Sequence, residues 1–373
     1  MTRQKILFFF EYGTLNGGEL SMLAMLGALG QTEFEFVAAA PASGMLPERL
    51  EQCGVEVLPL VLRDTRGQRR PIDQINSHLL ETVRRVSPDL VHSNSLSMGR
   101  MIGRIARQLS VPCTAHLRDI IKLSERAVCD LSQNAGLIAV SHATEQFHVE
   151  QGMLSDKLRV IYNGVDTELF RPAAATGILK QQLDLHDSAV LLANIGQICL
   201  RKGQTVLAQA AMCLAEEFPE ANYLFIGQRH SEKAESIAYE NSIEQTFREA
   251  GIEKRFFRLG FREDVPLILN EVDLVVHTAH QESLGRVLLE AASCGRAIVA
   301  TKVGGTAEIL ADGISALLVR PGDHEALAAA IRRMLTDREL RIRLGRQART
   351  AAIERFSLPA AAANVRAFWK SFL

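Results

Sequence analysis

Two glutamates separated by seven residues are the side chains of this sequence whose types and spacing point most directly to chemistry. Glu282 and Glu290 lie in the segment HQESLGRVLLEAASCGRAIVAT, residues 280–301, and Gly285 stands between them. The first turn of a helix offers unpaired N–H groups and the positive end of the helix dipole, and a glycine lets another group approach the backbone. We therefore expect a helix with Gly285 in its first turn that binds an anion, with Glu282 at the mouth of the site and Glu290 two turns deeper.

The same spacing allows a purely structural interpretation. Glu282, Arg286 and Glu290 are four residues apart, so on one helix they would form a solvated ladder of ion pairs. The flanking segments favour the anion site, because VDLVV and AIVAT are typical of buried strands. An apolar face that would pack on a sheet is formed by Leu284, Val287, Leu288 and Ala291.

Short apolar segments alternate with helical patterns along the whole chain and must position these side chains. ILFFF (residues 6–10) is typical of a strand, and INSHLLETVRRV (residues 75–86) is typical of a helix. Such alternation predicts the α/β class, with parallel sheets covered by helices on both faces. A stretch with a less regular strand–helix pattern follows residue 170 and separates two such alternations. We therefore predict two Rossmann-like, doubly wound domains, residues 1–170 and 171–355, which face each other across a cleft.

The first strand-to-helix loop of the second domain carries candidate phosphate ligands. In NIGQICLRKGQ (residues 194–204), Gly196 permits a close backbone approach, and Arg201 and Lys202 supply cations for a diphosphate. The alternative is an ordinary solvated Arg-Lys pair. Further along, Phe261 and Arg262 follow a predicted strand and could flank a nucleotide base.

Candidate residues in the first domain also fall at strand ends. Gly17 and Gly18 open a helix after the first strand, either as a tight turn or as a backbone that faces the cleft. His92 and His116 end two later strands, where each is either a structural hydrogen-bonding residue or a site residue. Arg118 and Asp119 follow directly. His142 reads as part of a helix N-terminal turn with Ser141 or Thr144 as the cap, not as a chemical group.

The bulk composition excludes several classes of protein. The 373 residues carry a net charge of −1, so the total charge does not suggest nucleic acid as a partner. ILFFF is too short for a signal-peptide core or a membrane span, and the six cysteines form no CxxC pair, which fits a reducing cytosol. The basic stretch RDTRGQRR, Arg63 to Arg70, is either an exposed loop or a contact for anionic lipid or an anionic acceptor.

Three longer segments resemble family 4 glycosyltransferases, which have the GT-B fold and are also called glycosyl transferases group 1. Residues 258–323 resemble the donor-site signature of that family, whose E-x7-E element is matched by Glu282 and Glu290. VIYNGVDTELFRP (residues 160–172) resembles its interdomain link, and NGGEL (residues 16–20) its acceptor-domain glycine loop. The resemblance, together with apolar residues such as Trp369 that need a surface to cover, implies that residues 356–373 form a helix crossing back to the first domain.

The resemblance implies an enzyme that transfers a sugar, with retention and without a metal or other cofactor, from a nucleotide diphosphate sugar to a hydroxyl acceptor. UDP- or GDP-sugar is the expected donor. Glu282 would face the donor sugar and Lys202 would neutralise the leaving phosphate, with His116 contacting the sugar. Glu290 would bind the ribose. The other expected donor-binding residues are Gly17, Gly18, Gly196, Gln197, Arg201, Phe261, Arg262, Ser283, Leu284, Gly285 and Arg286.

The expected acceptor is a glycan, a lipid-linked glycan or a small molecule, held in the first domain near Gly17, Gly18, His116 and Arg118, with Asp119 and His92 as further candidates. This places the enzyme in cell-surface polysaccharide or glycoconjugate synthesis, in the cytoplasm or peripherally on the inner face of the plasma membrane through Arg63–Arg70. One departure from the family pattern is Gln197, which stands where an arginine is usual. Two alternatives remain on the same fold: a nucleotide-sugar epimerase and a non-catalytic protein that binds a sugar nucleotide.

Overall fold

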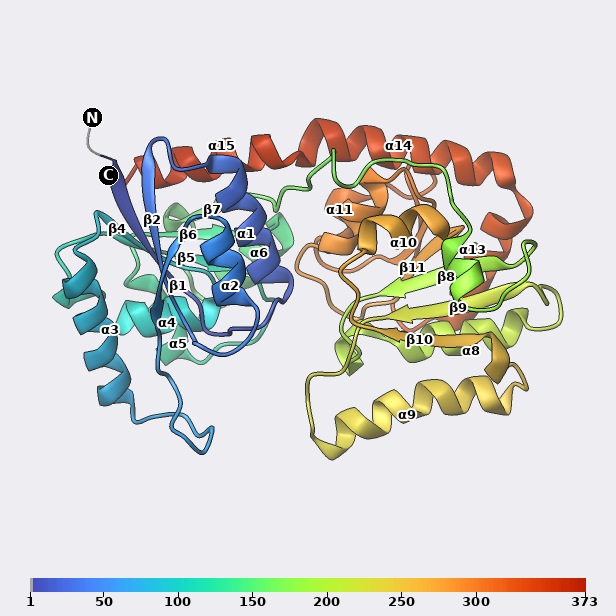
Figure 1. The fold of residues 1–373 in the computed structure, drawn as a ribbon, viewed down its shortest axis with the longest axis horizontal. Coiled ribbons are helices and arrows are strands. Elements are labelled where there is room, and N and C mark those ends of the chain that lie inside the picture. Colours follow the sequence, from blue (N-terminus) through green and yellow to red (C-terminus); the bar gives the residue numbers. More distant parts are fainter. Residues whose placement is uncertain (1–2) are drawn as a thin grey trace. The chain divides into compact units, whose positions relative to one another are not determined.

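The computed structural model describes residues 3–373 and divides into two compact units (Figure 1). Unit 1 is Met1–Gly164 together with Leu358–Leu373, and unit 2 is Val165–Ser357. The sequence places the junctions at 170/171 and 355/356, whereas the contacts place them at 164/165 and 357/358.

Unit 1 is built on seven parallel strands in the order β3-β2-β1-β4-β5-β6-β7. The strands are β1 (Gln4–Phe9), β2 (Phe34–Ala40), β3 (Glu56–Pro59), β4 (Leu90–Ser93), β5 (Cys113–Leu117), β6 (Gly136–Ala139) and β7 (Leu158–Val160). The helices are α1 (Gly17–Leu29), α2 (Leu46–Gln52), α3 (Ile72–Val86), α4 (Leu96–Ile105), α5 (Glu125–Ser132), α6 (His142–Val149) and α15 (Leu358–Lys370), with 3-10 turns η1 (Ala106–Gln108) and η2 (Ser155–Lys157).

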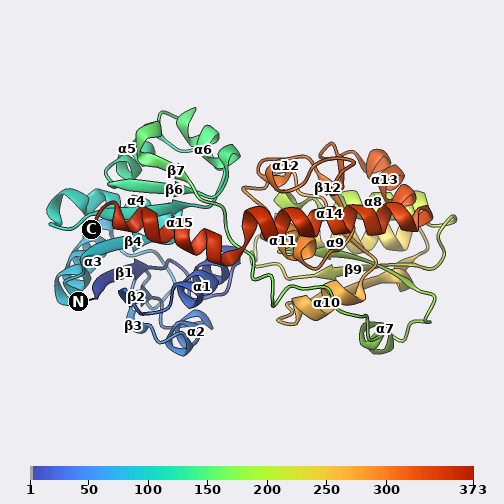
Figure 2. The same cartoon turned by 90° about the horizontal axis from the view of Figure 1, so that it is seen from above.

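Alternation along β1 explains why helices cover both faces of this sheet. Ile6 and Phe8 belong to one apolar cluster, which contains residues of α1 and α15. Leu7 and Phe9 belong to another, which contains residues of α3 and α4. Successive side chains of a strand point to opposite faces, so a continuous apolar run requires two covered faces. In α15, which Figure 2 shows along unit 1, Trp369 is fully buried.

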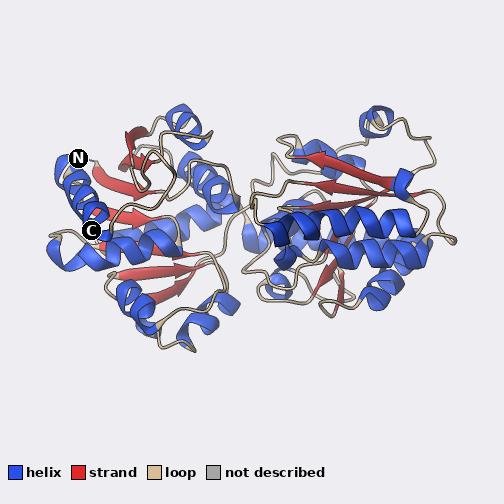
Figure 3. Ribbon diagram, turned by 90° about the horizontal axis from the view of Figure 1, so that it is seen from below, coloured by secondary structure: helices blue, strands red, loops and turns tan. Residues whose placement is uncertain are grey.

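Unit 2 is built on six parallel strands in the order β10-β9-β8-β11-β12-β13, with helices on both sides (Figure 3). The strands are β8 (Val190–Ile195), β9 (Ala221–Ile226), β10 (Phe256–Gly260), β11 (Leu274–His277), β12 (Ile298–Thr301) and β13 (Leu317–Val319). The helices are α7 (Ile178–Gln182), α8 (Gln204–Leu214), α9 (Ala234–Glu249), α10 (Val265–Glu271), α11 (Arg286–Ser293), α12 (Thr306–Ile309), α13 (His324–Thr336) and α14 (Arg338–Phe356), with 3-10 turns η3 (Leu200–Lys202) and η4 (Glu253–Arg255).

Both sheets confirm the predicted doubly wound α/β class, and each has one point where the strand order reverses. In unit 1 the reversal lies between β1 and β4, and in unit 2 between β8 and β11. Loops that leave the carboxyl ends of these neighbouring strands diverge, and the crevice between them is the usual ligand site of such sheets. Within the described residues, no helix combines the length and the apolar character needed to cross a membrane.

Candidate active site

The loops after β8 and β11 are held together at the reversal point of unit 2. The Thr278 hydroxyl donates to the Lys202 carbonyl at 2.9 Å, and the His280 N–H donates to the Arg201 carbonyl at 2.8 Å. Gly203 has a φ of +61°, and a Cβ added there would lie 2.2 Å from the Thr278 carbonyl oxygen. Only a glycine therefore lets the two loops close on each other, and their closure brings Lys202 beside Glu282.

The Glu282 carboxylate lies at the centre of a group of hydrogen-bond donors. Lys202 Nζ lies 2.5 Å from Glu282 Oε2, His277 Nε2 lies 3.0 Å from the same oxygen, and Arg201 lies 4.0 Å from Oε1. Glu282 is only 7% exposed. Burial alone would favour the neutral acid, but the Lys202 charge and the His277 hydrogen bond outweigh it and hold the pKa of Glu282 far below its ordinary value. The site therefore keeps a buried, ionised carboxylate at neutral pH.

His277 is the last residue of β11 and is buried. Its pKa is lowered chiefly by burial, which outweighs the hydrogen bond to Glu282. A neutral His277 that donates from Nε2 to a carboxylate has a lone pair on Nδ1, and Nδ1 has no partner among the described residues. His277 thus fixes the orientation of Glu282 without adding a charge.

Helix α11 begins one residue later than the sequence predicts. Gly285 precedes the helix as its N-cap, with a φ of +99° that side chains rarely adopt. The prediction that Gly285 lies inside the first turn is therefore wrong, and so is the helical ladder through Glu282, because Glu282 belongs to the loop before the helix. The positive φ and the tight fit against Leu288, whose side chain would lie 2.8 Å from an added Cβ, are the physical reason for the later start.

Glu290 lies on α11 and is 7% exposed. Arg286 Nε lies 2.7 Å from Glu290 Oε1, one turn away on the same helix. Burial raises the pKa of Glu290 even though Arg286 opposes the shift. The structure therefore separates the two glutamates electrostatically: Glu282 is held ionised by surrounding cations, and Glu290 is a carboxylate that burial makes easier to protonate.

The other predicted residues of unit 2 lie around these loops. Gly196 has a φ of +147°, and a Cβ added there would lie 3.7 Å from Lys202 Cε. The Gln197 side chain is exposed. Phe261 is 42% exposed just beyond β10, and Arg262 forms an ion pair with Asp264 instead of standing free. Ser283 and Leu284 occupy the loop before α11, where Leu284 is buried.

In unit 1 the predicted residues lie at the ends of β1, β4 and β5. Arg118 donates to the Asn94 carbonyl, to Asn94 Oδ1 and to Asn163 Oδ1 at 2.8–3.0 Å. A Cβ added to Gly18 would lie 2.9 Å from Arg118 Cδ, so the glycine gives this side chain room. Gly17 begins α1. Asp119 is exposed, and its carbonyl oxygen lies 2.9 Å from His148 Nε2.

The two predicted histidines form a buried pair. His92 Nε2 lies 2.7 Å from His116 Nδ1, and the two side chains are 0% and 3% exposed. The structure gives His92 contacts with other buried side chains and no exposed surface. Its assignment to the acceptor remains a prediction, while its contact with His116 is a feature of the structure.

Comparison with known proteins gives the family. Residues 15–169 match the model described as Glycosyltransferase Family 4, and residues 177–351 match Glycosyl transferases group 1. The chain is 32% identical over 233 residues to D-inositol 3-phosphate glycosyltransferase of Corynebacterium urealyticum, covering 60% of this chain and 54% of that protein. It is 30% identical over 296 residues to the enzyme of that name from Corynebacterium efficiens, covering 72% of this chain and 69% of that protein.

The chain belongs to glycosyltransferase family 4. Among solved structures, that of Anabaena Alr3699/HepE in complex with UDP and glucose matches with a TM-score of 0.85 and 26% identity, covering 99% of this chain and all of that chain. These similarities confirm the predicted family and the GT-B fold, and they make the protein a glycosyltransferase.

Sequence reasoning missed three residues of this glycosyltransferase that the structure brings beside the predicted site residues of the two units. His277 ends a strand five residues before Glu282, and that position was its only signal. Gly203 lies in the KG pair of the Lys202 loop, where its positive φ is invisible in the sequence. Glu19 follows Gly18 and is 5% exposed, and burial raises the pKa of its carboxyl.

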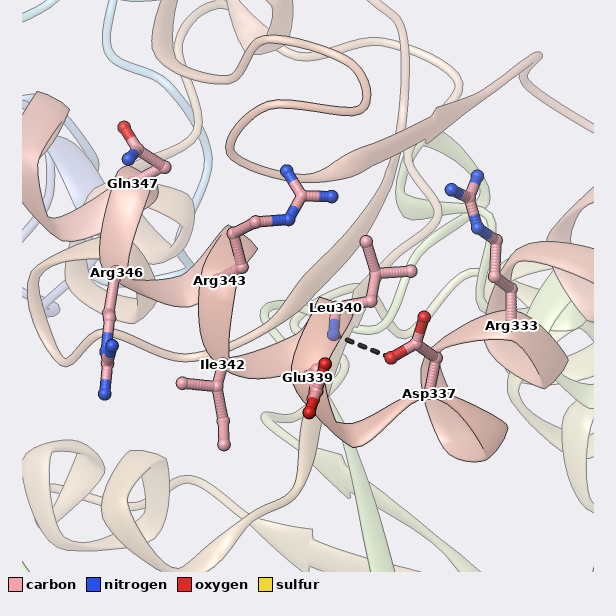
Figure 4. Close-up of a pocket in the computed structure, with 8 residues that line it drawn as sticks. All are labelled: Arg333, Asp337, Glu339, Leu340, Ile342, Arg343, Arg346 and Gln347. Atoms are coloured by element: carbon pink, nitrogen blue, oxygen red, sulfur yellow. Dashed lines mark hydrogen bonds between the residues drawn. The ribbon is translucent and has the colours of Figure 1, made fainter.

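Other features of the glycosyltransferase lie outside these sites. The Arg63–Arg70 stretch is mostly exposed and turns back on itself through a bridge between Arg63 and Arg69. Ser141 caps α6, as predicted, by accepting from the Thr144 N–H. A surface hollow of about 630 Å³ along α14 shares no residue with the predicted site (Figure 4). Within residues 3–373, no group of three or more His, Cys, Asp or Glu side chains is placed to hold a metal.

Proposed function

We propose that this glycosyltransferase transfers a sugar from a UDP- or GDP-sugar to a hydroxyl acceptor, with retention of configuration and without a metal. The observation that carries the proposal is the buried, ionised Glu282 beside two cations and the start of α11. A helix N-terminus, a glycine with an open backbone and a lysine are the groups that bind a diphosphate. The UDP and glucose found with the Anabaena protein support a nucleotide sugar as donor.

Each group then has a defined task. The N–H groups at Gly285 and Arg286 bind the diphosphate. Lys202 gains a second anionic partner and neutralises the charge that develops on the departing phosphate, which is where preorganised positive charge accelerates a reaction most. Glu282, fixed by His277, faces the sugar, and Glu290 with Arg286 binds the ribose. Positive charge for the leaving group thus comes from this chain's own residues.

The acceptor is proposed to bind unit 1 near Gly17, Gly18 and Arg118, where the backbone N–H groups at the start of α1 offer hydrogen-bond donors and the guanidinium group adds positive charge for an oxygen-rich molecule. A role in polysaccharide or glycoconjugate synthesis in the cytoplasm follows from this proposal. The exposed Arg63–Arg70 stretch would then give the enzyme an electrostatic contact with anionic lipid on the inner membrane face.

The test is release of nucleoside diphosphate from a panel of UDP-, GDP-, ADP- and dTDP-sugars, with EDTA present and with Glu290→Ala as a folded control. We expect slow release from one donor, abolished in the variant and accelerated by acceptor glycans. Donor turnover that requires added divalent metal would contradict metal-free transfer. Release that never responds to an acceptor and yields an epimerised sugar would favour an epimerase.

A further inference from the structure

A chain of hydrogen bonds runs through the core of unit 1 from α15 to His116. Trp369 Nε1 donates to His92 Nδ1 at 3.2 Å, and His92 Nε2 lies 2.7 Å from His116 Nδ1. The ring planes of His92 and His116 are nearly perpendicular, at 86°. Trp369 and His92 are both 0% exposed, and His116 is 3% exposed. The fourth ring nitrogen of this pair, His116 Nε2, has no hydrogen-bond partner among the described residues. It is not one of their fully buried polar atoms without a partner, so it keeps some exposed surface.

The direction of each bond follows from the donor that starts the chain. An indole N–H can only donate, so His92 Nδ1 accepts and carries no proton. A neutral His92 then carries its proton on Nε2 and donates to His116 Nδ1. His116 Nδ1 accepts in turn, so the proton of a neutral His116 is on Nε2. The exposed end of the chain is therefore a hydrogen-bond donor.

Thr114 offers the competing arrangement. Its hydroxyl oxygen lies 2.8 Å from His92 Nδ1 and donates to the Val91 carbonyl at 3.2 Å. A His92 protonated on Nδ1 could donate to Thr114, and the whole chain would then reverse. That arrangement leaves the buried Trp369 N–H without an acceptor, which proteins rarely tolerate. The Thr114 hydroxyl can rotate to suit either state, whereas the indole cannot, so Trp369 decides the outcome.

We propose that Trp369 is a positioning residue which, through His92, fixes His116 in the tautomer that presents an N–H from Nε2 to the donor sugar. His116 then binds a sugar oxygen as a hydrogen-bond donor and does not act as a base. The assignment of this N–H to the sugar rests on the proposed transfer and on the sugar contact that the family resemblance implies for His116, whereas the tautomer itself rests on neither. Trp369 thereby links α15 to the carboxyl end of β5 within unit 1.

The electrostatic surroundings agree with two neutral rings. Burial, reinforced by the nearby Arg118 cation, lowers the pKa of His92 to about 3. Burial, Arg118 and His92 likewise hold the pKa of His116 well below its ordinary value. A protonated His116 would also bring two N–H groups face to face across 2.7 Å. The chain of bonds and the charges therefore favour the same protonation state.

The first measurement is the tautomer of each histidine, read from ring ¹⁵N chemical shifts of the full-length protein labelled on histidine. We expect both His92 and His116 to carry their proton on Nε2. In Trp369→Phe, the proton of His92 should move to Nδ1 and be donated to Thr114, so both rings should become protonated on Nδ1. Thr114→Val removes the competing acceptor and should leave both rings as in the parent protein. A parent protein with His92 protonated on Nδ1 would overturn the proposal.

The second measurement separates positioning from packing by rescue. Trp369→Phe should lower kcat/KM for the donor at least tenfold, and adding Thr114→Val should recover most of that loss. In the double variant His92 Nδ1 has no partner, and an unpaired lone pair there is better tolerated than an unpaired buried N–H. A packing defect would not be repaired by a second core substitution, so absence of rescue with an unchanged tautomer refutes the role of Trp369. The tautomers are measured without substrate, so they remain testable if the proposed transfer itself fails.

Discussion

Replacing Lys202 with methionine should leave Glu282 as a buried carboxylate with too little positive charge around it. Lys202 Nζ lies 2.5 Å from Glu282 Oε2, whereas Arg201 lies 4.0 Å away and the pKa of His277 is lowered, so His277 adds no charge at pH 7. The Lys202 and Glu282 side chains are 14% and 8% exposed, so solvent screens the pair little. The substitution should therefore lower the stability of unit 2.

The magnitude follows from two opposing terms. At an effective dielectric constant of about 20, a pair of unit charges attracts by about 4 kcal/mol at 4 Å and by more at the separation seen here. Desolvation of both groups cancels several kcal/mol of this attraction, but removing one partner leaves the desolvated charge behind, which costs about 3–5 kcal/mol in buried pairs. We expect Lys202→Met to lower the free energy of unfolding of unit 2 by about 3 kcal/mol at pH 7.

The effect should depend on pH in one direction. The folded pKa of Glu282 lies below its ordinary value, so its ionised form stabilises the fold above the ordinary pKa. This contribution decreases as the pH falls toward the folded pKa. The loss caused by Lys202→Met should accordingly be smaller at pH 4 than at pH 7.

The chain allows the two units to be followed separately. Its single tryptophan, Trp369, lies in the core of unit 1, so its fluorescence reports that unit and serves as an internal control. Hydrogen exchange of the β8 and β11 amides reports the opening of unit 2. Glu282→Gln and the double variant complete a thermodynamic cycle, in which a coupling of about 3 kcal/mol is expected. A coupling below about 1 kcal/mol, the value of an exposed pair, would refute the account of a buried, ionised Glu282.

Three further substitutions test other parts of the site. Because burial raises the folded pKa of Glu290, its ionised form destabilises the fold above that pKa; Glu290→Gln should therefore raise the unfolding free energy at pH 7 but not at acid pH, and chemical denaturation at both pH values checks this. Gly285→Ala should lower the free energy of unfolding by about 1 kcal/mol or more beyond the effect of Gly313→Ala. Both glycines have a positive φ, but only at Gly285 would the added Cβ meet a neighbouring side chain; equal melting temperatures of the two variants would contradict the tight fit. Gln197→Arg should lower the donor KM about tenfold by adding one charge-assisted hydrogen bond, and an unchanged KM would remove position 197 from the diphosphate site.

The part of the site that lies along one loop and one helix could be predicted from the sequence. The local pattern indicates Glu282, Gly285 and Glu290, because a strand, a glycine and an apolar helix face follow one another within a few residues. Lys202 could be predicted because strand-to-helix loops of a doubly wound sheet gather at the same edge. The parallel sheets themselves follow from the alternation of apolar strands with helical patterns.

The remainder depends on contacts between residues that are distant in the chain. The late start of α11 is set by the positive φ of Gly285 and by Leu288, neither of which a helical periodicity reports. Gly203 is required because its φ is positive and because the Thr278 carbonyl oxygen lies 2.2 Å from the position of its missing Cβ. His92 is buried among side chains that include Trp369, which is 277 residues away in sequence. The sequence therefore does not distinguish a strand-end histidine that faces a ligand from one that faces a tryptophan.

Locating the bound nucleotide tests directly whether the donor binds the loops around Lys202 and Glu282. A photoreactive derivative of the nucleoside diphosphate that the donor panel selects would be crosslinked to the full-length protein and mapped by mass spectrometry, with excess unlabelled nucleotide as the control. We expect competed labels in unit 2, on peptides that contain Gly196–Lys202, Phe261–Arg262 or Glu282–Glu290. Competed labels confined to unit 1, or to the α14 hollow at residues 333–347, would contradict this expectation.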